Sequence, residues 1–207
     1  MEITTHSIFP CPVAIVKRDS KFTSKENKEV KDIIKEGLFS NSGNSHSTNT
    51  NIFESKLKKL KQFCEQHLDT YIKEVICPKE DLNFYITQSW LNINKPGEFH
   101  HEHCHSNSII SGVFYVSTEE DDKIFFTDPN QKLKDLLRSE VTTFNLWNSS
   151  SWFFPAVTNE LLIFPSWLNH RVDQNEKATK NRISISFNTF VTGVMGSKER
   201  LTELILK

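Results

Sequence analysis

The sequence predicts a mainly β protein with N-terminal helices, and three observations lead to that fold class. The two long stretches of helical periodicity lie in the first 80 residues. From residue 84 onward, short runs rich in aromatic and β-branched residues follow one another, separated by polar turn sequences. Almost no helical pattern lies between these runs, which favours a sandwich or barrel over an alternating α/β fold.

Two amphipathic helices are expected in the N-terminal part. The first runs from Thr23 to Gly37, because Thr23 and Glu26 have the spacing of a capping box and Gly37 stands where helices commonly end. A second, longer helix begins at about Glu54 and is followed by the repeat of apolar residues at steps of three and four. Its apolar positions are Leu57, Leu60, Phe63, Cys64, Leu68, Tyr71 and Val75. The polar residues 40–51 between the two helices are predicted to form an irregular loop.

Seven strand candidates follow Pro78, and one helix candidate, 131–138, interrupts them. Each strand candidate is short and is bounded by turn residues. They are residues 84–94, 99–105, 108–116, 123–127, 151–157, 160–164 and 182–190. We therefore expect a single domain, 1–207, in which a helical part (1–80) packs on a β core (81–192). Residues 193–207 are expected to form a C-terminal helix or tail.

The composition excludes several classes of function. A chain of 207 residues with a formal net charge of −1 offers no electrostatic case for nucleic acid or an anionic membrane as the main partner. Only six residues are glycine, and no phosphate-binding glycine loop is present. The first residues lack the basic and apolar regions of a secretory signal, and no apolar run approaches about 20 residues, so we expect neither a leader nor a membrane span. Its four scattered cysteines are expected to be free, mostly buried thiols, which favours a cytoplasmic location.

Half of the eight histidines fall between residues 100 and 105. An ordinary strand face gains nothing from so many imidazoles, so we interpret the cluster as metal ligands. In a strand, residues two apart share a face, which puts His101, His103 and His105 on one side. Two imidazoles at i and i+2 can bind one ion where a strand ends or kinks. His170, the only other histidine of the strand-rich part, is the natural third ligand.

A second ligand set remains open. His100 and Glu102, also two residues apart, form with His170 a two-His-one-carboxylate triad. Either set leaves coordination positions free, which is typical of a catalytic site, whereas a structural zinc site uses four protein ligands. The donor set therefore favours an Fe(II) oxygenase-type centre over a structural zinc site, and a catalytic zinc site stays an alternative.

A polar row begins twelve residues after His170. Arg182, Ser184, Ser186 and Asn188 occupy alternate positions of a predicted strand and therefore share a face. An arginine near a metal can bind a carboxylate through two parallel hydrogen bonds, and a hydroxyl two residues on can add another. The competing interpretation is an edge strand whose polar side faces water.

The order of these motifs resembles the Fe(II)/2-oxoglutarate-dependent oxygenase superfamily, and most closely an oxygenase family found in phages and marine bacteria. The resemblance extends over most of the chain and rests on residues 88–94 (QSWLNIN), 103–116 (HCHSNSIISGVFYV), 126–129 (FTDP), 162–172 (LIFPSWLNHRV) and 182–188 (RISISFN). It implies a double-stranded β-helix core, which is a cupin-like jelly roll. It also implies a non-haem dioxygenase that uses Fe(II) and 2-oxoglutarate as a cosubstrate to hydroxylate a substrate.

By this resemblance, His103 and His170 match the first and the distal iron ligands. His105 stands where the superfamily usually has Asp or Glu, and three-His iron sites occur in other jelly-roll dioxygenases. The alternatives are therefore a three-His cupin-type dioxygenase or another metal enzyme that does not use 2-oxoglutarate. A non-catalytic jelly roll that binds a metal or a small ligand is the alternative from another class.

The resemblance also implies a cosubstrate subsite. Arg182 and Ser184 match the Arg-x-Ser pair that binds the distal carboxylate of 2-oxoglutarate. Tyr115 occupies a position that often joins this pair, and Asn92 is a further candidate. The implied partners are O₂ and an unidentified small-molecule or protein substrate. Exposed edge strands commonly support dimers, so a homodimer is also an expectation.

Overall fold

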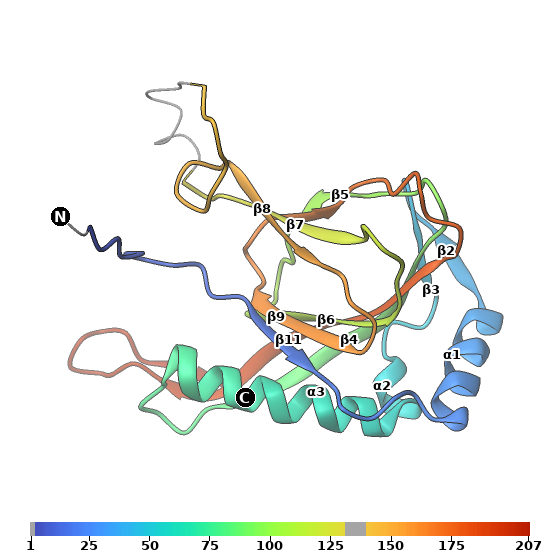
Figure 1. Cartoon of the computed structure of the whole chain (residues 1–207). Helices are drawn as coiled ribbons and strands as arrows, with labels where there is room; N and C mark the ends of the chain where they lie inside the picture. Colours follow the sequence, from blue (N-terminus) through green and yellow to red (C-terminus); the bar gives the residue numbers. More distant parts are fainter. Residues whose placement is uncertain (1–2, 131–139) are drawn as a thin grey trace.

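The computed structural model describes residues 3–130 and 140–207. Two antiparallel sheets form its core and face each other across a shared interior (Figure 1). The strands of the larger sheet are β1 (Ala14–Lys17), β2 (Leu38–Ser40), β3 (Ser45–Ser47), β4 (Asn83–Asn94), β6 (Ile110–Ser117), β9 (Glu160–Pro165), β11 (Arg182–Met195) and β12 (Leu204–Leu206). They are arranged in the order β1-β9-β6-β11-β4-β3-β2, and β12 pairs with the C-terminal part of β11.

The smaller sheet covers the inner face of the larger one. Its strands, in spatial order, are β5 (His100–His103), β10 (His170–Val172), β7 (Lys123–Thr127) and β8 (Ser151–Pro155). An apolar cluster that includes Tyr115, Phe126 and Phe164 fills part of the interior between the two sheets. The same interior contains a cavity that is lined by residues of both sheets, among them His103 and Arg182.

The central strand of the larger sheet is β11, which pairs with β4 on one side and with β6 on the other. Ile185 and Phe187 point to the outer face and are fully buried in the apolar cluster that the helices complete. Arg182 and Ser184 point to the interior and line the cavity. The polar row therefore belongs to a strand paired on both sides, and the edge-strand interpretation is wrong.

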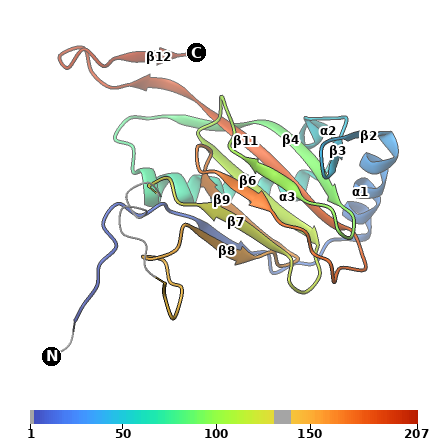
Figure 2. The ribbon, with the colours of Figure 1, turned by 90° about the horizontal axis from the view of Figure 1, so that it is seen from above.

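Helices cover the outer face of the larger sheet, where α3 (Lys58–Tyr71) lies behind the strands in Figure 2. The first predicted helix is confirmed as α1 (Ser24–Glu36), with the expected capping box at its start. The second predicted helix is divided. It begins as the short α2 (Ile52–Ser55) and is interrupted at Leu57, which is fully buried and has a φ of 54°.

Beyond α3, the chain continues as a π-helical turn, η1 (Ile72–Ile76). The expectation that Val75 belongs to the apolar face is wrong, because this side chain is 42% exposed. A π-helical turn contains more residues than an α-helical turn. The spacing of three and four residues that keeps the apolar side chains of α3 on one face therefore no longer holds in η1.

All seven predicted strands are present as β4 to β9 and β11, with ends shifted by a few residues. Five short strands in the described residues, β1, β2, β3, β10 and β12, were not predicted. The predicted loop at 40–51 contains β3, which pairs with β4 and extends the larger sheet. Residues 193–207 contain β12, which pairs with β11 in a projecting hairpin instead of forming a helix. The predicted helix 131–138 lies outside the described residues.

The four cysteines are free thiols, but they are not mostly buried as predicted. Only Cys64 is buried, whereas Cys11, Cys77 and Cys104 are exposed. In residues 3–130 and 140–207, none of the helices combines the length and the apolar character that crossing a membrane requires.

Candidate active site

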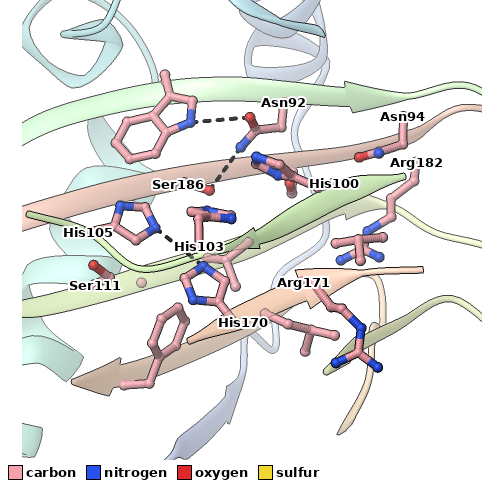
Figure 3. Close-up of a pocket in the computed structure, with 17 residues that line it drawn as sticks. Asn92, Asn94, His100, His103, His105, Ser111, His170, Arg171, Arg182 and Ser186 are labelled. Carbon is pink, nitrogen blue, oxygen red and sulfur yellow. Dashed lines mark hydrogen bonds between the residues drawn. The ribbon is translucent and has the colours of Figure 1, made fainter. Parts of the chain in front are cut away.

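Three imidazoles converge at one end of the cavity (Figure 3). His103 ends β5 and His170 begins β10, and the two residues pair directly across the antiparallel ladder. His105 follows the end of β5, where its N–H donates to the Ser166 carbonyl at 2.9 Å. One ring nitrogen of each histidine lies within 4.8 Å of the others. The structure thus brings together the three residues that the sequence analysis selected.

Backbone carbonyls orient two of these rings. His103 Nδ1 donates to the His101 carbonyl at 2.8 Å, and His170 Nδ1 donates to the Leu168 carbonyl at 3.0 Å. Each bond keeps the proton on Nδ1 and leaves the lone pair on Nε2, which in His170 faces Nε2 of His105 at 3.3 Å. The third ring, His105, stacks on the indole of Trp90 with centroids 5.7 Å apart.

Burial keeps these imidazoles neutral. It lowers the pKa of His170 to about 3 and that of His105 to about 4, and in both cases the neighbouring His103 lowers the pKa further. The pKa of His103 is also lowered, mainly by burial. A neutral imidazole is the form that binds a metal ion, so at neutral pH the three side chains are in the ligand state.

The predicted division of the histidines between the two faces of β5 is wrong for His100 and His101. Between the two ladder pairs His103–His170 and His100–Val172, β5 has one residue more than β10, which is a β-bulge. The bulge turns His100 toward the cavity together with His103, whereas the exposed His101 ring lies beside them and does not line the cavity. Burial lowers the pKa of His100 to about 3, with further contributions from the neighbouring histidines and from Arg182.

The alternative triad of His100, Glu102 and His170 is not assembled. The Glu102 carboxylate accepts a hydrogen bond from Thr127 Oγ1 and lies 3.5 Å from Arg171 Nη1. Among the described residues, the groups with metal-ligand geometry are made of histidines alone.

Arg182 lies at the other end of the cavity from His105 (Figure 3). Its side chain is buried, with Nη1 donating to the Lys123 carbonyl at 2.9 Å and Nη2 donating to Tyr115 Oη at 3.4 Å. Nε has no hydrogen-bond partner, and no carboxylate of the described residues forms an ion pair with the guanidinium. A buried charge without a counter-ion is costly, so this arrangement indicates a site for an anionic ligand.

The other predicted residues of the cosubstrate subsite lie around Arg182. Ser184 lines the cavity, and it pairs with Asn92 of β4 on one side and with Tyr115 of β6 on the other. Asn92 also lines the cavity, where its amide accepts from Trp90 Nε1 at 3.2 Å and donates to Ser186 Oγ at 3.0 Å. Tyr115 is fully buried and reaches the site only through its contact with Arg182.

Two residues that line the cavity, Trp90 and Asn94, were not selected by the sequence analysis, and His100 was selected only as a ligand of the alternative triad. Strand alternation identifies the first two, because Trp90 and Asn94 stand two residues to either side of Asn92 on β4. His100 carries no such signal, because a bulge breaks the alternation that its position would otherwise follow.

A sequence model of the family described as "Putative 2OG-Fe(II) oxygenase" matches residues 88–188, which include all of the site residues above. The chain belongs to the 2OG-Fe(II) oxygenases. It is therefore an enzyme that uses Fe(II) and 2-oxoglutarate. No curated protein sequence matches this oxygenase significantly.

Solved structures with a similar fold have low sequence identity to this oxygenase. A prolyl-4-hydroxylase from Pseudomonas putida is 14% identical, with 86% of this chain and 92% of that chain covered and a TM-score of 0.55. A viral collagen prolyl hydroxylase from Paramecium Bursaria Chlorella virus-1, in a 2OG complex, is 11% identical, with coverage of 86% and 94% and a TM-score of 0.52. HygX from Streptomyces hygroscopicus, with nickel, 2-oxoglutarate and hygromycin B bound, is 8% identical, with coverage of 86% and 82% and a TM-score of 0.56. These similarities confirm the jelly-roll fold.

The residues of this oxygenase fit its two cofactors. Three neutral imidazoles are suitable ligands for Fe(II) and leave positions for other ligands. The buried guanidinium, with an unpartnered Nε, suits a carboxylate. Both the three imidazoles and the unpaired guanidinium are features of this chain itself, so the fit does not depend on the comparisons with other proteins.

Proposed function

We propose that this oxygenase holds Fe(II) through His103, His105 and His170 and hydroxylates a C–H bond of its substrate. One observation carries the proposal: a single cavity holds three convergent neutral imidazoles and a buried arginine that lacks a carboxylate partner among the described residues. Bound Fe(II) and 2-oxoglutarate supply the activation of O₂, and the protein positions them and limits the access of water.

Arg182 and Ser184 are proposed to bind the distal carboxylate of 2-oxoglutarate. Their side chains lie on the same inner face of β11, two residues apart, and both line the cavity. Tyr115 is proposed to act through Arg182, because its hydroxyl accepts from Nη2 and its ring lies under the guanidinium, 5.1 Å from centroid to Cζ. Both contacts restrict the rotamers of Arg182, so the guanidinium is already oriented for binding before a ligand arrives.

Asn92 is proposed as a weaker contact of the cosubstrate. Its amide is fixed between Trp90 and Ser186, which leaves one N–H of the amide group for a ligand. The same indole stacks on His105. Trp90 therefore connects the metal ligand with the wall of the subsite.

The third imidazole has a consequence for charge. With a carboxylate in the position of His105, Fe(II) and its protein ligands would carry a net charge of +1, whereas three neutral imidazoles leave it at +2. A more positive centre binds anionic ligands more tightly and holds Fe(II) at a different redox potential. We infer that this site has a high affinity for the 2-oxo acid end of the cosubstrate.

The substrate is proposed to be a small molecule or a protein segment. Two of the similar structures are named as prolyl hydroxylases and one is named with hygromycin B bound, so both kinds occur among proteins of this fold. A homodimer and a cytoplasmic location remain our proposals for the assembly and its compartment, and the four free thiols support the latter.

Oxygen uptake and succinate release, measured together with and without 2-oxoglutarate after anaerobic loading with Fe(II), test the proposed function. We expect both signals to require Fe(II) and 2-oxoglutarate. Oxygen uptake that does not depend on 2-oxoglutarate would instead indicate a three-His dioxygenase of the cupin type. Failure to bind Fe(II) at all would leave only a non-catalytic jelly roll.

A further inference from the structure

A fourth imidazole, His100, lies inside the cavity and has no role in the proposed ligand set. Its ring stacks on His103 with centroids 4.3 Å apart and planes at 27°. No described residue forms a hydrogen bond with its ring nitrogens. Figure 3 shows His100 between the convergent histidines and Arg182. Bulges are often found next to active sites, where they redirect a side chain, and this bulge directs His100 to the inside.

His100 could instead belong to a second metal site, because His100, His101 and His103 also have nitrogens within 4.8 Å of one another. His103 is common to both groups, and its Nδ1 donates to the His101 carbonyl. Only Nε2 of His103 is therefore available, and it can serve one ion at a time. The group with His170 draws on two strands and is more buried, whereas His101 is exposed. We therefore assign His103 to the more buried group with His105 and His170, and His100 then has no metal ion to bind.

We propose that His100 binds the 2-oxo acid end of the cosubstrate, donating a ring N–H to its C1 carboxylate. This inference rests on the proposed function. Arg182 and Ser184 account for the distal carboxylate, so an anion that extends from the metal to Arg182 passes His100. Every protonation state of histidine retains at least one N–H donor, and a donor next to a buried carboxylate forms a charge-assisted bond. His100 is thus a binding residue for the cosubstrate and a specificity element for 2-oxo acids.

Two ligands separate the roles of His100 and Arg182. 2-Oxoglutarate has both carboxylates, and 2-oxobutanoate has the 2-oxo acid end alone. Their affinities for the Mn(II)-loaded full-length protein are measured by isothermal titration calorimetry. We expect His100→Phe, which keeps a ring for stacking on His103, to weaken both ligands by about tenfold to a hundredfold. Arg182→Ala is expected to weaken 2-oxoglutarate alone.

Two further variants complete the design. His100→Gln restores an N–H donor and is expected to recover most of the lost affinity for both ligands. His101→Phe makes the same change at the neighbouring exposed ring, which does not line the cavity, and is expected to leave both affinities unchanged. The affinity for Co(II), measured by its absorption spectrum without any oxo acid, is expected to be the same in the wild-type protein and in all the His100 variants.

The results distinguish this inference from the function on which it rests. Wild-type protein that binds 2-oxoglutarate, together with a His100→Phe variant that binds both oxo acids equally well, would overturn the role of His100 alone. Loss of Co(II) binding in His100→Phe would overturn it in favour of a metal ligand. Wild-type protein that binds the metal but no 2-oxoglutarate would overturn the proposed function and this inference with it.

Discussion

The Nε2 atoms of His105 and His170 lie 3.3 Å apart, and the planes of the two rings differ by only 2°. Two nitrogens bound to one ion at about 2.1 Å, with an angle between them of about 90° to 109°, are about 3.0–3.4 Å apart. The separation is therefore that of two neighbouring ligands of a single ion. Because burial keeps both rings neutral, charge repulsion does not oppose this close approach.

Replacing any one of the three proposed ligands is expected to abolish stable iron binding. In His103→Ala, His105→Ala or His170→Ala, two imidazoles remain, and we expect the affinity for Fe(II) to fall by at least about a hundredfold. Iron content after anaerobic purification, together with Co(II) titration, measures this. His101→Ala is the control, because the exposed ring of His101 lies outside the cavity. Full iron content in His170→Ala would contradict the ligand assignment.

Arg182→Met is expected to weaken the binding of 2-oxoglutarate without lowering the stability of the ligand-free protein. We expect the affinity for 2-oxoglutarate to fall at least about a hundredfold, because a charge-assisted bidentate contact is lost. The melting temperature of the ligand-free protein should not fall, since an unpaired buried charge is replaced by an apolar chain. Arg171→Met is a matched control, because Arg171 is already paired with Asp173 at 2.8 Å. A large loss of stability in Arg182→Met would show that the guanidinium has a structural role instead.

Gly112 is expected to be irreplaceable as long as Phe187 is present. A Cβ atom at position 112 of β6 would come within 2.2 Å of the Phe187 ring on β11. We expect Gly112→Ala to lower the free energy of unfolding by about 1–3 kcal/mol or more, as overpacking does. In Gly112→Ala combined with Phe187→Leu, the loss should be smaller than the sum of the two single losses. Urea unfolding of the four proteins provides the comparison, and strict additivity would exclude a clash.

Glu26 is expected to contribute more stability than other carboxylates of α1. Its carboxylate accepts from Arg18 Nη2 at 2.8 Å and from the Thr23 N–H at 2.9 Å, and the side chain is almost fully buried. Burial raises its pKa, but the hydrogen bonds from Thr23 and Arg18 outweigh burial and hold the pKa below the ordinary value. Glu26→Gln is expected to cost about 3–5 kcal/mol. In Glu36→Gln, where the pair with Lys56 is exposed, the cost should stay below about 1 kcal/mol.

The metal-free protein is expected to lose stability in weak acid. The pKa values of His105 and His170, about 4 and about 3, lie below the value of about 6.5 for an unfolded histidine. Below about pH 6.5 the unfolded chain therefore binds more protons than the folded one. Each such imidazole lowers the free energy of unfolding by about 1.4 kcal/mol per pH unit between its two pKa values. Urea unfolding in the presence of a chelator measures this slope, which should be smaller in His105→Phe.

Strand alternation and turn residues were sufficient to predict most of the β core. β7 (Lys123–Thr127) has the predicted bounds, and the inward row that begins at Arg182 follows strand periodicity without interruption as far as Asn188. The convergence of His103 with His170 was predicted from two short motifs more than sixty residues apart. That these histidines bind iron, and that Arg182 and Ser184 bind 2-oxoglutarate, stays a prediction.

Two of the wrong predictions have causes that lie in the tertiary structure. Leu57 adopts a left-handed conformation that leucine rarely occupies, and its burial in the core compensates for that strain. β3 is a strand because Ser45 and His46 pair with β4, although serine has little tendency to form strands. Such tertiary effects are not encoded by the neighbouring residues, so a pattern in the sequence cannot reveal them.

Because of the bulge in β5, the spacing of the histidines along the chain does not by itself determine which of them face the cavity. His100 and His103 are three residues apart and face the same way, as two histidines separated by one residue would in a regular strand. A homologous chain that lacks one residue here, and has no bulge, would present the same imidazoles to the cavity. Two members of this family can therefore differ in the length of the segment and still build the same site. A deletion of Glu102 that retains metal binding would demonstrate this equivalence.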